Sequence, residues 1–326
     1  MYSLLSKGMS DSLIAGIGAA LLFLVTYFCL RKPFGFLPSD RGKVVTTVDG
    51  KKMDINGKSA GKTTGVGLVF VCILLLGCIV FLPINLELIL NLFLVLIMMV
   101  VGYLDDTAKT PWNEYVKGAL DLVIALAAVI VFVIFNGTDV SFFGISFHMN
   151  TVLYVILGVV LIWASINVTN CSDGVDGLCG GVSAIEMAAF MIIFHSNLRE
   201  YRYMTALFIA VLVAYLRFNW YPSTVLMGDA GSRAIGFFLA LLSMHSGHPF
   251  IFVLLSLVFI LDGGLGLIKV SLKRFLKIVI FANTQMPLHD HFIKQKKMER
   301  PKTSAMFIFA EAIVAVVTGV LLLIFA

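Results

Sequence analysis

Long apolar stretches separated by short polar ones repeat along the whole chain. Ten of them approach the roughly 20 residues that a helix needs to cross a bilayer. They lie at 12–30, 66–83, 86–104, 117–135, 150–166, 178–195, 203–218, 232–246, 249–269 and 304–325. The pattern predicts an all-α polytopic membrane protein with ten transmembrane helices, organised as one integral membrane domain over residues 1–326. The first stretch lacks a small-residue cleavage site, so we expect it to be retained.

Two stretches depart from simple spans. Residues 136–149 alternate Val, Ser and Phe around Gly144, which predicts a small hairpin on the outer surface, with an irregular loop as the alternative. In the ninth span, glycines within 263–266 precede a segment, 270–282, whose apolar and basic positions fall on opposite helical sides. We expect this span to bend at the glycines and to continue as an amphipathic helix near the lipid headgroups; a solvated basic turn is the alternative.

Composition excludes a soluble globular protein, because 60% of the residues are hydrophobic and only 13% are charged. The basic residues give the orientation. With the N-terminus outside, 21 of the 24 Lys and Arg residues fall in the five alternate connections, at 31–65, 105–117, 167–177, 217–233 and 269–302. The positive-inside rule therefore places these connections in the cytoplasm and predicts an N-out, C-out topology. Basic residues sorted by membrane side do not indicate a nucleic-acid partner.

Three of the inner connections carry aspartates, two of them beside asparagine and glycine. They read LDDTAK at 104–109, NVTNCSDGVDGL at 167–178 and FNWYPSTVLMGDAGSR at 218–233. Oxygen donors that converge from several helix ends suit a hard cation such as Mg²⁺, which takes one or two protein carboxylates and completes its shell with water and substrate phosphates. Each aspartate alone has a simpler interpretation, as a helix cap or a solvated loop charge. Their common inner layer favours a shared site.

The last inner connection adds PLHDHF at 287–292, in which His289 and His291 follow a proline. Histidines in such a turn suit hydrogen bonding to a pyrophosphate or proton transfer. As a metal site the pair is weak, since no third ligand is adjacent in the sequence.

These motifs together resemble those of the polyprenyl-phosphate N-acetylhexosamine-1-phosphate transferases, and most of all their bacterial peptidoglycan branch, the phospho-N-acetylmuramoyl-pentapeptide transferases. The resemblance covers nearly the whole chain. It implies a catalytic group made of Asp105, Asp106, Lys117, Asp229, His289 and His291, with Asp229 as the metal ligand. It implies a substrate-binding group made of Lys58, Lys62, Lys109, Asn167, Asn170, Asp173, Gly174, Asp176 and Asn219. The chain departs from the family at Asp290, where a third histidine is common, and in the loose match of 61–67 to the family signature.

The resemblance also implies the reaction. Phospho-MurNAc-pentapeptide would pass from UDP-MurNAc-pentapeptide to undecaprenyl phosphate, giving lipid I and UMP on the cytoplasmic face of the bacterial plasma membrane. Asp105 and Asp106 would act on the lipid phosphate, Mg²⁺ would be the cofactor, and a homodimer is implied. The family allows direct attack by the lipid phosphate or a covalent intermediate on an aspartate, and we favour direct attack because the phosphate needs only positioning. The bent ninth span would form a groove for the acceptor chain.

Two other functions compete with this one. A related transferase would use a different donor, such as UDP-GlcNAc. An ion-coupled secondary transporter would use carboxylates at mid-membrane, for which Asp262 and Glu186 are the candidates. The interpretation as a transporter also requires a pair of repeated structural units, and the sequence shows no internal repeat.

Overall fold

The computed structural model of the chain describes residues 2–32, 35–40, 44–46, 52–54, 61–108, 110 and 112–325. Two of the expected substrate contacts, Lys58 and Lys109, lie outside these ranges.

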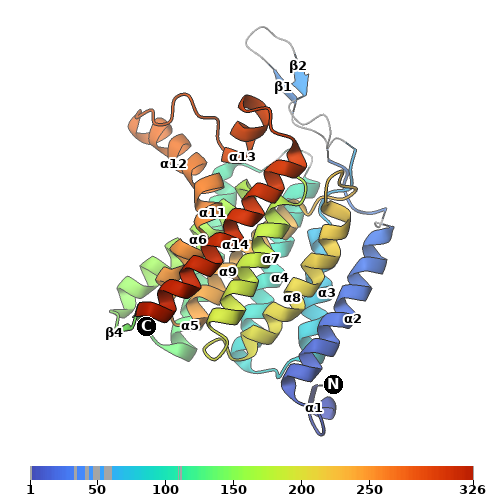
Figure 1. The fold of residues 1–326 in the computed structure, drawn as a ribbon, viewed down its shortest axis with the longest axis vertical. Coiled ribbons are helices and arrows are strands. Elements are labelled where there is room, and N and C mark those ends of the chain that lie inside the picture. Colours follow the sequence, from blue (N-terminus) through green and yellow to red (C-terminus); the bar gives the residue numbers. More distant parts are fainter. Residues whose placement is uncertain are drawn as a thin grey trace.

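A bundle of long helices makes up most of the molecule (Figure 1). Six are long and apolar enough to cross a membrane. These are α2 (Asp11–Arg31), α4 (Leu86–Thr107), α5 (Glu114–Asn136), α6 (Thr151–Cys171), α8 (Glu200–Asn219) and α14 (Arg300–Phe325). A bent helix near the C-terminus raises the number to seven if it is one span. The chain is therefore a multi-pass membrane protein.

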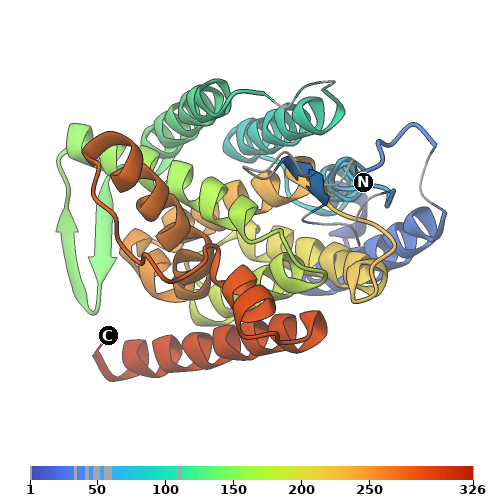
Figure 2. The same cartoon turned by 90° about the horizontal axis from the view of Figure 1, so that it is seen from above.

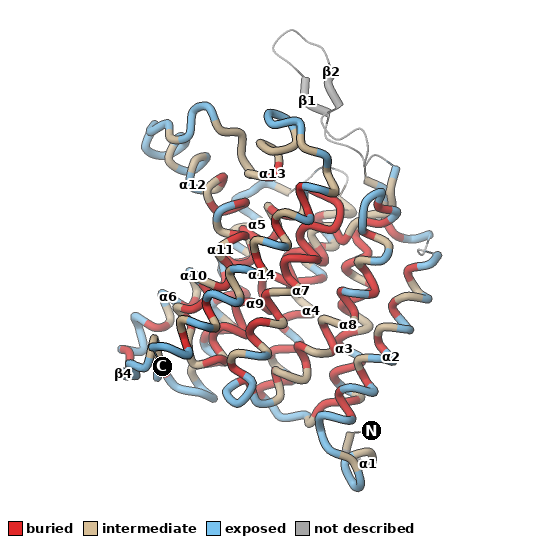
Figure 3. The backbone as a smooth tube through the Cα atoms, in the orientation of Figure 1, coloured by how far each residue is buried: buried red, intermediate tan, exposed pale blue. Residues whose placement is uncertain are grey.

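Three further helices fill the bundle. Two are apolar but shorter, α3 (Gly67–Phe81) and α7 (Leu178–Ile193). The third, α9 (Gly228–His245), is the central helix and has nearly all of its residues buried (Figure 3). All ten predicted stretches thus coincide with helical segments, but length and composition support only six or seven spans. The prediction of ten spans is not confirmed.

Helix α9 lies close to its neighbours because glycines remove side chains at the contacts. A Cβ on Gly67 of α3 would lie 2.1 Å from the backbone nitrogen of Gly231, and one on Gly102 of α4 would lie 2.4 Å from the carbonyl oxygen of Asp229. The outer helices instead expose apolar side chains such as Ile17 and Phe309. This arrangement is typical of a protein that lipid tails surround.

Two short antiparallel hairpins complete the described chain. One pairs β1 (Val44–Thr46) with β2 (Lys52–Asp54), and the other pairs β3 (Asp139–Phe142) with β4 (Ile145–His148). The second is the predicted hairpin, with Asp139 opposite His148. It lies near the C-terminal end of α14 and far from β1 and β2 (Figures 1 and 2).

The ninth span is bent, as predicted, but the bend is not at the predicted glycines. The helix turns by 63° at Ser256, between the segment Pro249–Leu255 and the segment Leu257–Leu276. Its short parts are η1 (Pro249–Ile251), α10 (Phe252–Leu255), α11 (Leu257–Phe259), η2 (Ile260–Gly264), α12 (Leu265–Ser271) and η3 (Leu272–Leu276). The glycines lie in the π-helical turn η2, where a Cβ on Gly263 would lie 2.6 Å from the carbonyl oxygen of Val168. The glycine there permits close packing on α6 and does not bend the chain.

The expected amphipathic helix over 270–282 is also shorter than predicted. Helical structure ends at Leu276, and Lys277 adopts a positive φ of 59°. The following residues Ile278 and Val279 are exposed. Beyond them lie α13 (Leu288–Asp290) and η4 (His291–Gln295); the other short helix, α1 (Tyr2–Leu5), is at the N-terminus.

Candidate active site

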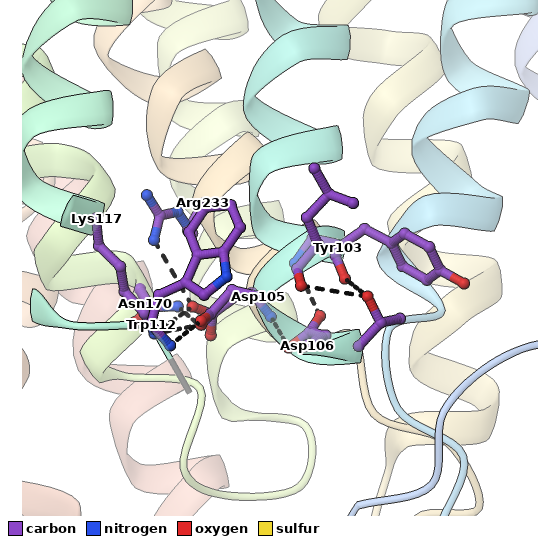
Figure 4. A network of polar contacts seen from close by, with 12 residues as sticks. Tyr103, Asp105, Asp106, Trp112, Lys117, Asn170 and Arg233 are labelled. Atoms are coloured by element: carbon purple, nitrogen blue, oxygen red, sulfur yellow. Dashed lines mark hydrogen bonds and ion pairs between the residues drawn. The ribbon is translucent and has the colours of Figure 1, made fainter. Parts of the chain in front are cut away.

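The two adjacent aspartates lie in the last turn of α4, since this helix continues to Thr107. Successive helical residues point in directions about 100° apart, so the two carboxylates have different partners. Asp105 accepts a hydrogen bond from the backbone N–H of Trp112 at 2.8 Å and forms an ion pair with Lys117. Figure 4 shows Trp112 and Lys117 on the Asp105 side, with Asp106 apart from them.

Asp106 caps the start of α9. Its carboxylate oxygens accept hydrogen bonds from the backbone N–H groups of Asp229 at 3.1 Å and Ala230 at 3.2 Å. A carboxylate at a helix N-terminus satisfies N–H groups that have no partner within the helix and interacts favourably with the helix dipole. Asp106 thereby fixes Asp229 against the end of α4.

Asp229 is the meeting point of three polar side chains. Its Oδ2 lies 3.4 Å from Nζ of Lys117 and 3.7 Å from Nη1 of Arg233, and its Oδ1 accepts a hydrogen bond from Nδ2 of Asn170 at 3.0 Å. Lys117 and Asp229 keep 26% and 23% of their side-chain surface exposed. These two groups are therefore accessible to a ligand, while the charges around them are largely buried.

Sequence reasoning missed the buried pair behind this cluster. Arg233 on α9 forms an ion pair with Asp121 on α5, and both are almost completely buried. Lys117 and Asp121 are four residues apart on α5, as are Asp229 and Arg233 on α9, so two ion pairs of opposite polarity link the helices. The matching spacing of four residues, with the charge order reversed, was the available signal.

The loop between α6 and α7 is held by a second polar group. Oδ2 of Asp176 accepts a hydrogen bond from the backbone N–H of Ser223 at 3.0 Å and lies 3.4 Å from Nζ of Lys62, which also donates to Oγ of Ser223 at 2.7 Å. Asn219 accepts from the backbone N–H of Gly177 at 2.9 Å and donates to the carbonyl of Val225 at 2.9 Å. Asp176, Asn219 and Lys62 thus shape the loop.

Asp173 in this loop faces other carboxylates. Burial away from water, together with the negative charges of Asp229, Asp106 and Asp176, raises the pKa of the Asp173 carboxyl well above its usual range. A bound cation would favour the ionised form of this group. Asn167, one turn before Asn170, has different partners. Its side chain donates a hydrogen bond to the carbonyl of Trp163 at 2.8 Å and another to the carboxylate of Asp121.

Of the two expected histidines, His289 lies against the loop between α6 and α7. It is buried, its Nδ1 lies 2.9 Å from Oδ2 of Asp262, and its backbone N–H donates to Oδ1 of Asp262 at 2.8 Å. A Cβ on Gly174 would lie 2.4 Å from Nε2 of His289, so the free side of the ring faces this glycine. Asp262 was predicted only as a mid-span carboxylate, and nothing in the sequence linked it to a histidine 27 residues away.

His291 and Asp290 have other partners. Nδ1 of His291 accepts from the backbone N–H of Gln285 at 3.4 Å, a long hydrogen bond, and its ring packs edge-on against Phe292. Asp290, where the family motif commonly has a histidine, forms an ion pair with Lys294 at 2.7 Å. These contacts stabilise the turn around α13.

No group of three or more His, Cys, Asp or Glu side chains with metal-binding geometry occurs among the described residues. The donor set nevertheless fits a hard cation that takes few protein ligands. Asp229 is partly exposed, and its charge acts on Asp173 together with that of Asp106. Carboxylates predominate here, and no thiol takes part in the network described above.

Comparison with known proteins supports the interpretation of these motifs. The family model described as "Glycosyl transferase family 4" matches residues 88–247. A phospho-N-acetylmuramoyl-pentapeptide-transferase of Treponema pallidum (strain Nichols) is 37% identical over 306 residues, which cover 86% of this chain and 82% of the relative. A protein of the same name from Caldanaerobacter subterraneus subsp. tengcongensis is 33% identical over 75% of this chain and 78% of its own length.

Proposed function

The chain belongs to the phospho-N-acetylmuramoyl-pentapeptide-transferase family, and we propose that it transfers phospho-MurNAc-pentapeptide from UDP-MurNAc-pentapeptide to undecaprenyl phosphate, giving lipid I and UMP. One observation carries the proposal. The accessible Lys117–Asp229 pair lies where α4, α5, α6 and α9 meet, with Asp105 and Asn170 beside it. This arrangement provides a cation for phosphate oxygens next to carboxylates suited to a metal ion.

We propose that ten helical segments cross the bacterial plasma membrane, with both termini outside and the active site in the cytoplasm. Both termini lie at one end of the bundle (Figure 1), as an even number of crossings requires. The opposite end carries α13 and the hairpin β1–β2 (Figure 1). That end also receives the basic connections, in agreement with the positive-inside rule.

In the proposed mechanism the lipid phosphate attacks the β-phosphate of the donor directly. Asp105 has both oxygens engaged, by Trp112 and Lys117, and the oxygens of Asp106 accept from the start of α9. These contacts suit orienting roles for both aspartates, and they support direct attack over a covalent intermediate on an aspartate. Asp105 orients Lys117, whose ammonium group would bind phosphate oxygens and bring the two anions together.

Three further groups complete the proposed site. Asp229 would hold Mg²⁺, with Asp106 and Asp173 nearby; when bound, the ion neutralises the donor pyrophosphate and stabilises the departing UMP. His289 would contact the donor substrate through Nε2. The loop held by Asp176 and Asn219 would form a wall of the nucleotide pocket.

The acceptor chain would occupy an apolar cavity between α6 and the bent ninth helix. The cavity has a volume of about 490 Å³, and Leu157, Leu161, Phe252 and Leu267 are among its lining residues. Its lining is almost entirely apolar, which suits a polyprenyl chain that stays in the bilayer.

The test is release of UMP by the purified protein, with undecaprenyl phosphate as acceptor and either UDP-MurNAc-pentapeptide or UDP-GlcNAc as donor. We expect activity with the first donor only, dependence on Mg²⁺, and a loss of about 100-fold or more in Asp229→Asn. Asp139→Asn is the matched control, because Asp139 is exposed in the distant β3–β4 hairpin.

Either of two results would overturn part of this proposal. UMP release from UDP-GlcNAc alone would reassign the donor. An Asp229→Asn protein with the wild-type melting temperature and the wild-type rate would remove Asp229 from the metal site.

A further inference from the structure

Two carboxyl side chains lie completely buried in the middle of the bundle, away from the proposed active site. Glu186 on α7 and Glu311 on α14 each have 0% of their surface exposed. Oε2 of Glu186 and both carboxyl oxygens of Glu311 have no hydrogen-bond partner in the described structure. The remaining oxygen, Oε1 of Glu186, accepts a hydrogen bond from Oγ of Ser256.

The two carboxyls belong to neighbouring helices. Among the residues that the structure describes, Ser256 is the one hydrogen-bond partner of the pair. Helices α7 and α14 pack against each other, and α14 also contacts α10 and α11 on both sides of Ser256. The pair therefore lies at the junction of three helices, and no lysine, arginine or histidine among the described residues pairs with either carboxyl.

Two ionised carboxylates in this position would be unfavourable. Each would lose its hydration without a compensating partner, and the two like charges would repel each other. Bound protons remove both problems, because a protonated carboxyl carries no charge and costs much less to bury. The unpartnered oxygens of Glu311 and Glu186 are the atoms that can carry these protons.

We propose that Glu186 and Glu311 hold at least one bound proton in the folded protein, and that this proton-binding site joins α7 and α14 to the bend of the ninth helix at Ser256. A small alkali cation is the less favoured occupant, because hard cations gather more oxygen ligands than two carboxyls and one hydroxyl supply. The site is separate from the transferase cluster and from the acceptor cavity.

The same site has a consequence for His289, which rests on the proposed function. Ser256 precedes Asp262 by two short helical turns of the same bent helix, and Asp262 holds His289. Glu186 and Glu311 are thus positioning residues for this arm of the active site. Their effect on protein stability can be measured whether or not the transferase assignment holds.

The experiment compares the wild-type protein with Glu186→Gln, Glu311→Gln and the double variant in detergent. Glutamine keeps the shape of a protonated glutamate and cannot release a proton. Glu299→Gln is the matched control, since Glu299 is an exposed acid just before α14. The readouts are the melting temperature between pH 6 and pH 9 at constant ionic strength, in sodium and in choline buffers, and the infrared band of protonated carboxyl groups.

With at least one more proton bound in the folded state than in the unfolded state, the unfolding equilibrium constant should rise about tenfold or more per pH unit, until the pair ionises. The wild-type and Glu299→Gln melting temperatures should therefore fall together with rising pH, and the double variant should show a flatter profile. The wild-type infrared spectrum should contain a carboxylic acid band that Glu311→Gln reduces.

Two results would overturn the proposal. One is a wild-type spectrum without a carboxylic acid band at neutral pH, a measurement that does not depend on whether the variants fold. The other is a melting temperature that follows sodium at fixed pH and ignores pH at fixed sodium, which would assign the site to an alkali cation. Loss of UMP release in every protein, including the wild type, would bear on the transferase assignment alone.

Discussion

Lys117 is the residue on which the proposed chemistry depends most directly. Its ammonium group forms ion pairs with Asp105 and, at 3.4 Å, with Asp229, yet part of the side chain stays exposed. The two carboxylates come from different helices, so the lysine is fixed from two sides. A cation held this way is preorganised for phosphate oxygens and needs little rearrangement when substrate binds.

We predict that Lys117→Met lowers kcat/KM for UMP release by about 100-fold, because it removes a positive charge aimed at the reacting phosphates. Lys302→Met is the control, since Lys302 is a largely exposed lysine paired with Glu299 near the start of α14. Initial rates and melting temperatures of both proteins decide the outcome. A Lys117→Met protein that keeps the wild-type rate would show that this cation does not contact the phosphates.

At the residue scale the sequence predicted which side chains lie together better than it predicted what each of them touches. Asp105, Asp106, Lys117, Asn170 and Asp229 do converge. The two aspartates have different partners because α4 continues through Thr107. A hydropathy profile does not locate the end of a helix to within one or two residues.

The α13 element depends on one buried carboxylate. Asp262, in the π-helical turn η2, accepts from the backbone N–H of His289 and lies 2.9 Å from its Nδ1. A carboxylate at Nδ1 favours the tautomer with the proton on that nitrogen, and the other ring nitrogen, Nε2, faces Gly174. One side chain thus fixes both the position and the tautomer of the histidine.

We predict that Asp262→Asn lowers kcat about 100-fold, since the amide would present N–H to Nδ1 or lose the backbone contact. The same change in a His289→Gln background should have little further effect, because residues that act as a unit are not additive. Asp290→Asn, which affects the neighbouring ion pair with Lys294, serves as the control. Full additivity of the two losses would separate Asp262 from His289.

At the element scale the bend of the ninth helix shows what a sequence pattern misses. Three glycines predicted a bend within 263–266, but two of them, Gly263 and Gly264, lie close to Val168 of α6, and the turn occurs at Ser256. A serine in a helix gives no clear sign of a bend. The deciding contact, a hydrogen bond to Glu186 on another helix, is a tertiary one.

The topology is a property of the whole molecule. We predict that Ser146→Cys in the outer hairpin reacts with a membrane-impermeant maleimide in intact cells, and that Lys296→Cys reacts only after permeabilisation. Both would be made in a chain whose five free cysteines have been replaced. Labelling of Lys296→Cys from outside would invert the orientation.

The sequence predicted the whole molecule well in class and less well in detail. Apolar periodicity located all ten helical segments, since lipid-facing helices must be apolar along their length. It could not show that α9 would be the central helix, because burial among other helices and exposure to lipid select similar residues. The homodimer remains a prediction.

The ion pairs between α5 and α9 also bear on how the protein is assembled. Taken alone, α9 carries Asp229 and Arg233 near its start, and an arginine entering hydrocarbon without a partner costs roughly 3 kcal/mol. Asp121 and Lys117, which are synthesised earlier, supply the matching charges. Helix α9 would therefore enter the bilayer beside α5, which is already inserted. The ion pairs that shape the site would also require α5 to insert before α9.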